Sequence, residues 1–108
     1  MAECEGKVAL VTGGTSGIGR ETSILFAQKG ARVVVAGRRE IEGKETIDLI
    51  RRAGGEGIFV RADVSRASEV KALVEKTVAA YGGLDYAFNN AGIEGHWVPI
   101  VEQTEDEW

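Results

Sequence analysis

Short β-branched runs alternate with longer segments of helical periodicity, and this pattern constrains the fold more than any other feature of the sequence. Strands are predicted at Val8 to Val11, Arg32 to Ala36, Ile58 to Arg61 and Leu84 to Asn89. Unbroken apolar runs such as Val33 to Val35 suit strands that are covered on both faces. Strands that alternate with helices pair in parallel through right-handed crossovers. The sequence therefore predicts an α/β fold whose sheet has the strand order 3-2-1-4, the first half of a doubly wound domain.

Predicted helices connect these strands. They run from about Ile18 to Lys29, from about Ile41 to Ala53, and along an apolar stripe that includes Val70 to Tyr81. Ser65 is the predicted N-cap of the third helix, because a serine oxygen accepts a hydrogen bond from a first-turn N–H group. The glycines expected to end the helices are Gly30, Gly54 with Gly55, and Gly82 with Gly83.

The last residues predict the start of another helix. Thr104 and Glu107 have the spacing of a capping box, but the helix body would have to follow Trp108. A single helical turn is not stable alone, and the strand ending at Asn89 would leave an unpaired apolar edge. We therefore expect the chain to be truncated.

Composition excludes several classes of protein. The 108 residues include 13 Lys and Arg against 17 Asp and Glu, and a net charge of −4 disfavours nucleic acid and anionic membranes as partners. No apolar run has the roughly 20 residues of a membrane span, and the start lacks the features of a secretory signal, so a cytoplasmic location is expected. Cys4 is the one cysteine, which excludes an internal disulfide and a cysteine-based metal site.

A glycine-rich segment, Thr12 to Gly19, directly follows the first predicted strand. Gly13 permits a tight turn, Gly17 lets a pyrophosphate approach the backbone, and Gly19 allows close packing of the helix on the strand. N–H groups at the helix N-terminus would then face the anion. A nucleoside-triphosphate loop is discounted, because Arg20 follows where that motif requires lysine. Glycines that serve only a tight turn are the alternative.

Three motifs together resemble a known family. Thr12 to Gly19, Asp63-Val64 and Asn89 to Gly92 are similar to the N-terminal half of a classical short-chain dehydrogenase/reductase, and the likeness spans about Gly6 to Trp108. The resemblance implies a Rossmann-like fold that binds a nicotinamide dinucleotide. It also implies that the full-length form is a homo-oligomer that interconverts small-molecule alcohols and carbonyls.

The resemblance also implies the residues of the cofactor site. It places the pyrophosphate over the glycine segment, the adenine ring at Asp63 and Val64, and the adenosine ribose side at Asn90 with Ala91 and Gly92. The predicted cofactor-binding residues are Gly13, Thr15, Ser16, Gly17, Ile18, Gly19, Arg38, Arg39, Asp63, Val64, Asn90, Ala91 and Gly92. The alternatives are that Asp63 caps a turn and that the asparagines tie neighbouring strands together.

The end of the second strand predicts which dinucleotide is bound. An acid there holds the ribose 2′-OH of NAD, whereas an arginine accommodates the 2′-phosphate of NADP. Here Gly37 takes the place of the acid, and Arg38 and Arg39 follow. Guanidinium groups bind phosphate with paired hydrogen bonds, so NADP is predicted over NAD. The alternative is a solvated turn that pairs with Glu40 and Glu42.

The chain as given has no predicted catalytic residues. The family's serine, tyrosine, lysine and helix asparagine lie after the Asn89 to Gly92 segment, and Tyr81 and Tyr86 lack the family's Y-x-x-x-K spacing. His96 would line the substrate loop or would serve only in packing. The sequence therefore predicts the cofactor-binding portion of an oxidoreductase. The alternative is a noncatalytic nucleotide-binding or interaction module.

Overall fold

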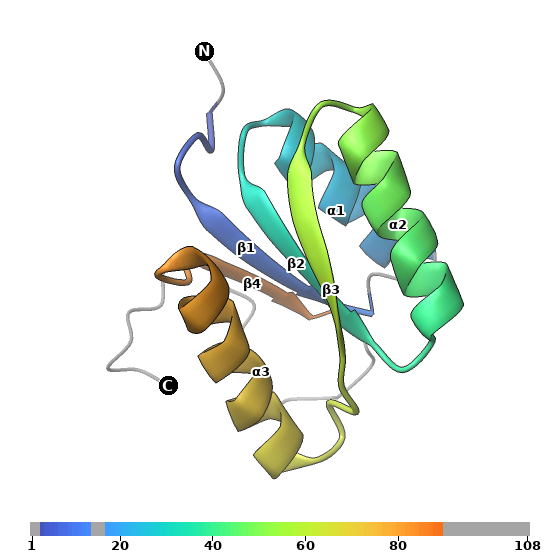
Figure 1. Ribbon diagram of the computed structural model, residues 1–108, viewed down its shortest axis with the longest axis vertical. Helices are drawn as coiled ribbons and strands as arrows, with labels where there is room; N and C mark the ends of the chain where they lie inside the picture. Colours follow the sequence, from blue (N-terminus) through green and yellow to red (C-terminus); the bar gives the residue numbers. More distant parts are fainter. Residues whose placement is uncertain (1–2, 14–16, 90–108) are drawn as a thin grey trace.

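The computed structural model describes residues 3–13 and 17–89 and has one parallel sheet. Its strands are β1 (Val8–Thr12), β2 (Arg32–Gly37), β3 (Glu56–Arg61) and β4 (Tyr86–Asn89). They pair in the order β3-β2-β1-β4 (Figure 1). The predicted α/β fold and strand order are confirmed.

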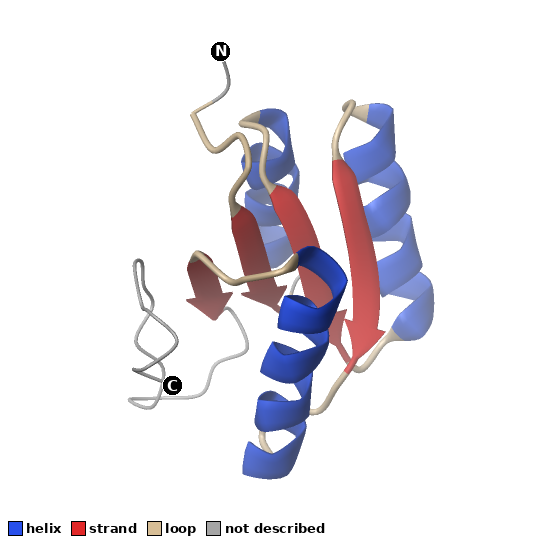
Figure 2. Cartoon of the chain, turned by 60° about the vertical axis from the view of Figure 1, so that its left-hand side comes forward, coloured by secondary structure: helices blue, strands red, loops and turns tan. Residues whose placement is uncertain are grey.

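Helices cover both faces of the sheet. These are α1 (Gly17–Gln28), α2 (Glu40–Arg52) and α3 (Ala67–Tyr81). α1 and α2 lie on one face, and α3 lies on the other (Figures 1 and 2). β1 is buried along its whole length and β2 from Val33 to Ala36, as the unbroken apolar runs predicted, whereas β3 and β4 are only partly buried.

Two hydrophobic cores form because successive strand residues point to opposite faces. Ala9, Val11, Val33 and Val35 belong to the core that also contains Ile50 of α2. The second core, on the other face, contains Leu10, Val34 and Ala36 of the strands with Leu73 of α3, and Val64 and Tyr81 pack against it. Val33, Val34 and Val35 are each 0% exposed, so β2 contributes fully to both cores.

The predicted helix ends are confirmed. Gly30, Gly54 and Gly82 all have positive φ angles, of 97°, 88° and 83°. At the end of α3 the Gly82 N–H group donates to the Val78 carbonyl at 2.7 Å, in the left-handed conformation that other residues resist.

The predicted N-cap of α3 is wrong. The N-cap residue is Arg66, and no side chain caps the helix there. The Ser65 hydroxyl instead donates to Asp63 Oδ1 at 2.6 Å, and the Ser65 N–H group donates to the same atom at 3.0 Å. This turn at Asp63 takes up Ser65, so the helix starts after it.

Four strand boundaries also differ from the prediction. β1 and β2 each extend one residue further, to Thr12 and Gly37. β3 begins at Glu56 because Glu56 lies opposite Arg32 in the parallel ladder, and a polar residue can join an edge strand. β4 begins only at Tyr86. The residue before it, Asp85, caps the start of β1, since its carboxylate accepts from the Val8 N–H group at 2.9 Å.

The capping box predicted at Thr104 and Glu107 lies outside the described residues. Within residues 3–13 and 17–89, no helix combines the length and apolar character that crossing a bilayer requires.

The substitution Leu10→Ala tests the assignment of the core between the sheet and α3. Leu10 is 0% exposed, and replacing such a leucine by alanine removes about 2–5 kcal/mol of stability through lost burial and a cavity. We expect Leu10→Ala to lower the urea midpoint of unfolding clearly. Ile41→Ala is the control, because Ile41 is 73% exposed and its truncation should leave the midpoint nearly unchanged. Equal effects of the two substitutions would contradict the assignment of the core.

Candidate functional site

The predicted site residues that the structure describes follow the carboxyl ends of the strands. In a parallel sheet these ends share one edge, where doubly wound folds bind their ligands. Gly13 follows β1 and its N–H group donates to the Ala36 carbonyl of β2 at 2.9 Å. Ala62 follows β3 and its N–H group donates to the Gly37 carbonyl at 2.9 Å. The turns after three neighbouring strands are therefore held together.

The glycine turn joins β1 to α1. Gly13 and Gly17 have φ angles of 72° and 58°, a region that L side chains rarely adopt. A Cβ built on Gly17 would meet nothing within 4 Å, so the backbone is open to a ligand there. The Gly13 N–H group is already bonded to the Ala36 carbonyl, so it shapes the turn, whereas the first N–H groups of a helix have no acceptor within the helix. Thr15 and Ser16 lie outside the described residues.

The first turn of α1 combines a buried and an exposed position. Gly19 is buried, and its carbonyl accepts from the Ser23 hydroxyl at 2.9 Å. Ile18 is 66% exposed at the same end of the helix. The glycine thus lies on the packed side of α1, and the isoleucine can contact a ligand from the solvent side.

Thr12 is a residue of this edge that the sequence did not predict. It ends β1, is 0% exposed, and its hydroxyl lies 2.8 Å from Asn89 Oδ1 and 3.5 Å from the Phe88 carbonyl. The contact ties β1 to β4 beside the glycine turn. The available signal was a hydroxyl at the end of an otherwise apolar strand. Asn89 thus ties strands together, whereas Asn90, Ala91 and Gly92 lie outside the described residues.

The turn after β2 carries two exposed arginines. Arg39 is the N-cap of α2, and its carbonyl accepts from the Gly43 N–H group at 2.9 Å. In the part of the chain that the structure describes, neither Arg38 nor Arg39 forms an ion pair with a carboxylate. Glu40 instead pairs with Lys44 at 3.2 Å. Neither guanidinium group is therefore held by a direct ion pair with these carboxylates.

Asp63 caps the turn that follows β3. Its carboxylate accepts from Ser65, and its N–H group donates to Glu69 Oε1 at 2.6 Å. The hydrogen bonds from Ser65 lower the pKa of Asp63, and the positive charges of Arg38 and Arg66 lower it further. The structure thus shows the turn-capping role of Asp63. Val64 is half-buried against the core under α3.

The two tyrosines of the described chain have packing roles. Tyr81 lies under the Arg32 guanidinium, 5.6 Å from its ring centroid, and burial raises the pKa of its hydroxyl. Tyr86 stacks on Phe26 with ring centroids 5.6 Å apart. Both rings are therefore held in the packing of the sheet. No group of three or more potential metal ligands occurs within residues 3–13 and 17–89.

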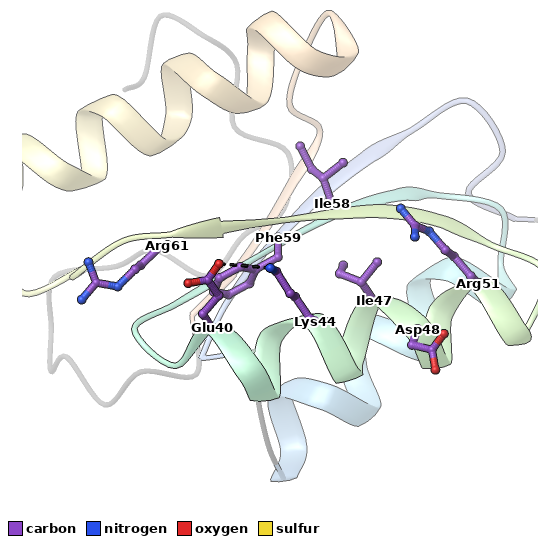
Figure 3. Close-up of a pocket in the computed structure, with 8 residues that line it drawn as sticks. All are labelled: Glu40, Lys44, Ile47, Asp48, Arg51, Ile58, Phe59 and Arg61. Carbon is purple, nitrogen blue, oxygen red and sulfur yellow. Dashed lines mark ion pairs between the residues drawn. The ribbon is translucent and has the colours of Figure 1, made fainter.

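A separate groove of about 640 Å³ lies between α2 and β3 (Figure 3). None of the predicted cofactor residues within the described part of the chain lines it. The lining residues are Glu40, Lys44, Ile47, Asp48, Arg51, Ile58, Phe59 and Arg61. The lining includes acidic, basic and apolar side chains, and the Glu40–Lys44 ion pair is part of it. We assign the candidate site to the turns after the strands and not to this groove.

Comparison with known proteins identifies the family. The profile of the short chain dehydrogenase family matches residues 7–108. The chain therefore belongs to the short-chain dehydrogenase family. It is 49% identical over 105 residues to the short chain dehydrogenase/reductase astE of Aspergillus oryzae, covering 96% of this chain and 40% of that protein. It is 44% identical over 108 residues to a 3beta-hydroxysteroid dehydrogenase of Mediterraneibacter gnavus, covering 100% of this chain and 39% of that protein.

Solved structures show the same fold. A glucose dehydrogenase of Caenorhabditis elegans in its apo form superposes with a TM-score of 0.80 at 37% identity, covering 84% of this chain and 40% of that one. An actinorhodin polyketide ketoreductase variant with NADPH superposes with a TM-score of 0.78 at 42% identity, covering 88% of this chain and 36% of that one. The chain thus spans about two fifths of the length of the relatives that it matches.

Ser65 tests the electrostatics of the Asp63 turn. Ser65→Ala removes the hydroxyl donor and keeps the backbone donor, so we expect the pKa of Asp63 to rise toward its usual range. NMR titration of the Asp63 carboxyl carbon measures this shift. Because the folded pKa is lowered, the stabilisation is complete above the unfolded pKa and is lost as the pH falls through the folded pKa. Ser68→Ala, in the exposed first turn of α3, is the control. An unshifted Asp63 in Ser65→Ala would contradict the turn geometry.

Proposed function

We propose that this chain is the cofactor-binding portion of an NADP-preferring oxidoreductase that interconverts alcohols and carbonyls by hydride transfer. One observation carries the proposal. The glycine turn at the N-terminus of α1 and the Arg38–Arg39 turn follow neighbouring strands at one edge of the sheet. This edge offers backbone donors for a pyrophosphate and guanidinium groups for one further phosphate.

The glycine turn fits the pyrophosphate. The open space around Gly17 lets the backbone approach an anion, and the first N–H groups of α1 supply donors. The positive end of the helix dipole adds to this attraction. Thr15, Ser16 and Ile18 complete this part of the proposed site.

The remaining proposed contacts surround the adenosine. Asp63 and Val64 are assigned to the adenine ring, and Asn90, Ala91 and Gly92 to the ribose side. Asp63 already accepts from Ser65 through Oδ1. Its Oδ2 atom, 4.0 Å from Arg66 Nε, is therefore the oxygen that we assign to the ligand.

Arg38 and Arg39 support the preference for NADP. Both are exposed, and neither forms an ion pair with a carboxylate among the described residues. The related ketoreductase with NADPH is consistent with this preference. Hydrogen bonds between charged groups contribute about 1.5–3 kcal/mol each, enough for discrimination of about tenfold or more.

The reaction would need groups beyond the described residues. When bound, the nicotinamide carries the hydride, and an acid or base near the substrate moves the proton. We assign those groups to the remainder of the complete protein, which we propose to be a cytoplasmic homo-oligomer. The relatives are named for steroid and glucose substrates, so only the substrate class is proposed: a small alcohol or carbonyl compound.

Arg38→Asp tests the cofactor preference. An aspartate accepts from a ribose 2′-OH and repels a 2′-phosphate, so we expect the ratio of NADPH to NADH affinity to fall by about tenfold or more in the complete protein. Fluorescence titration of both dinucleotides measures the ratio. Arg52→Asp is the matched control, because it makes the same charge change at the exposed far end of α2. An unchanged ratio in Arg38→Asp would defeat the NADP assignment.

A further inference from the structure

Arg20 links the first turns of α1 and α2. It follows Gly19 directly, and its guanidinium reaches across to three acceptors on α2. Nε donates to Thr46 Oγ1 at 2.9 Å, and Nη2 donates to the Glu42 carbonyl at 3.1 Å. A longer contact of 3.4 Å joins Nη2 to Glu45 Oε1. The Arg20 side chain is only 26% exposed, so this is a partly buried contact and not a mobile surface pair.

The acceptors of Arg20 are fixed in position. Thr46 is 0% exposed, and its hydroxyl donates to the Glu42 carbonyl at 3.1 Å. The planar guanidinium matches this arrangement, because its donors are fixed relative to one another. An arginine can therefore set the position of one helix against the other.

α2 also packs against the sheet. A Cβ on Gly43 would overlap the Phe59 ring of β3, so the helix backbone lies directly against that ring. Because Gly43 and Thr46 are three residues apart and both are buried, the contacts with β3 and with Arg20 hold the same face of α2.

These contacts lie close to both halves of the candidate site. Arg20 is three residues from Gly17 of the glycine turn, and its acceptor Glu42 is three residues from Arg39. The Arg39 carbonyl accepts from the Gly43 N–H group, in the same turn of α2 as the Glu42 carbonyl to which Arg20 donates. Arg20 therefore connects the two turns by a path that does not run through the sheet.

We propose that Arg20 is a positioning residue that holds the glycine turn and the Arg38–Arg39 turn at the separation that a 2′-phosphorylated dinucleotide spans. The inference rests on the proposed function. Its guanidinium is directed to α2, so it acts through the helix and not by contact with the ligand. A ligand that engages both turns depends on their separation, whereas a ligand that engages one turn does not.

Ligands of different reach test this inference in the complete protein. In the proposed site, 2′-AMP engages the Arg38–Arg39 turn, 5′-ADP engages the glycine turn, and NADP⁺ engages both. We expect Arg20→Met to weaken NADP⁺ about tenfold while the affinities for 2′-AMP and 5′-ADP stay unchanged. Calorimetric titration measures all three ligands, and thermal unfolding confirms that each variant is folded.

Thr46→Val supplies a second variant that removes the acceptor and keeps the shape of the side chain. We expect it to weaken NADP⁺ selectively. We expect the double variant to bind NADP⁺ no more weakly than Arg20→Met does, because Arg20→Met already removes the contact with Thr46. Arg52→Met is the matched control, because it removes an arginine from the exposed end of α2 and should leave all three affinities unchanged.

The outcomes separate this inference from the proposed function. If 2′-AMP does not bind the unaltered protein while 5′-ADP does, the NADP assignment fails. If all three ligands bind and Arg20→Met weakens them equally or not at all, the positioning role of Arg20 is overturned and the NADP assignment stands. If Arg20→Met does not fold, the affinities for the same three ligands are compared between Thr46→Val and the unaltered protein.

Discussion

The parallel pairing of β1 with both β2 and β4 is the constraint on which the site depends. It sets Thr12 opposite Ala36 on one side and opposite Asn89 on the other, so these strands end at the same edge of the sheet. Both faces must be covered, since their residues are apolar throughout. The helices that cover them start at that edge, and the helix N-termini therefore surround it.

The charged residues at this edge differ in whether they form contacts within the protein. Asp63 is used to close the turn before α3, and hydrogen bonds keep its pKa low. Glu40 is used in an ion pair along α2. Arg38 and Arg39 are not matched in this way by the described carboxylates. These two guanidinium groups are thus a local departure from the acidic balance of a chain whose net charge is −4.

Two contacts set the position of α2 against its neighbours. The absence of a side chain at Gly43 brings the helix against Phe59, and the Arg20 guanidinium binds Thr46 on the same buried face. Family membership explains the fold, and the matched relatives differ in the substrates they are named for.

Local sequence determined the order of elements, the covered sheet and the glycine turn. Periodicity and a backbone conformation that only glycine adopts easily are properties of neighbouring residues, as at Gly82. Tertiary structure decided the rest. The contact of Thr12 with Asn89 joins residues 77 positions apart, and that of Arg20 with Thr46 joins residues 26 apart. Both pairs depend on strand register and helix packing, which no local pattern encodes.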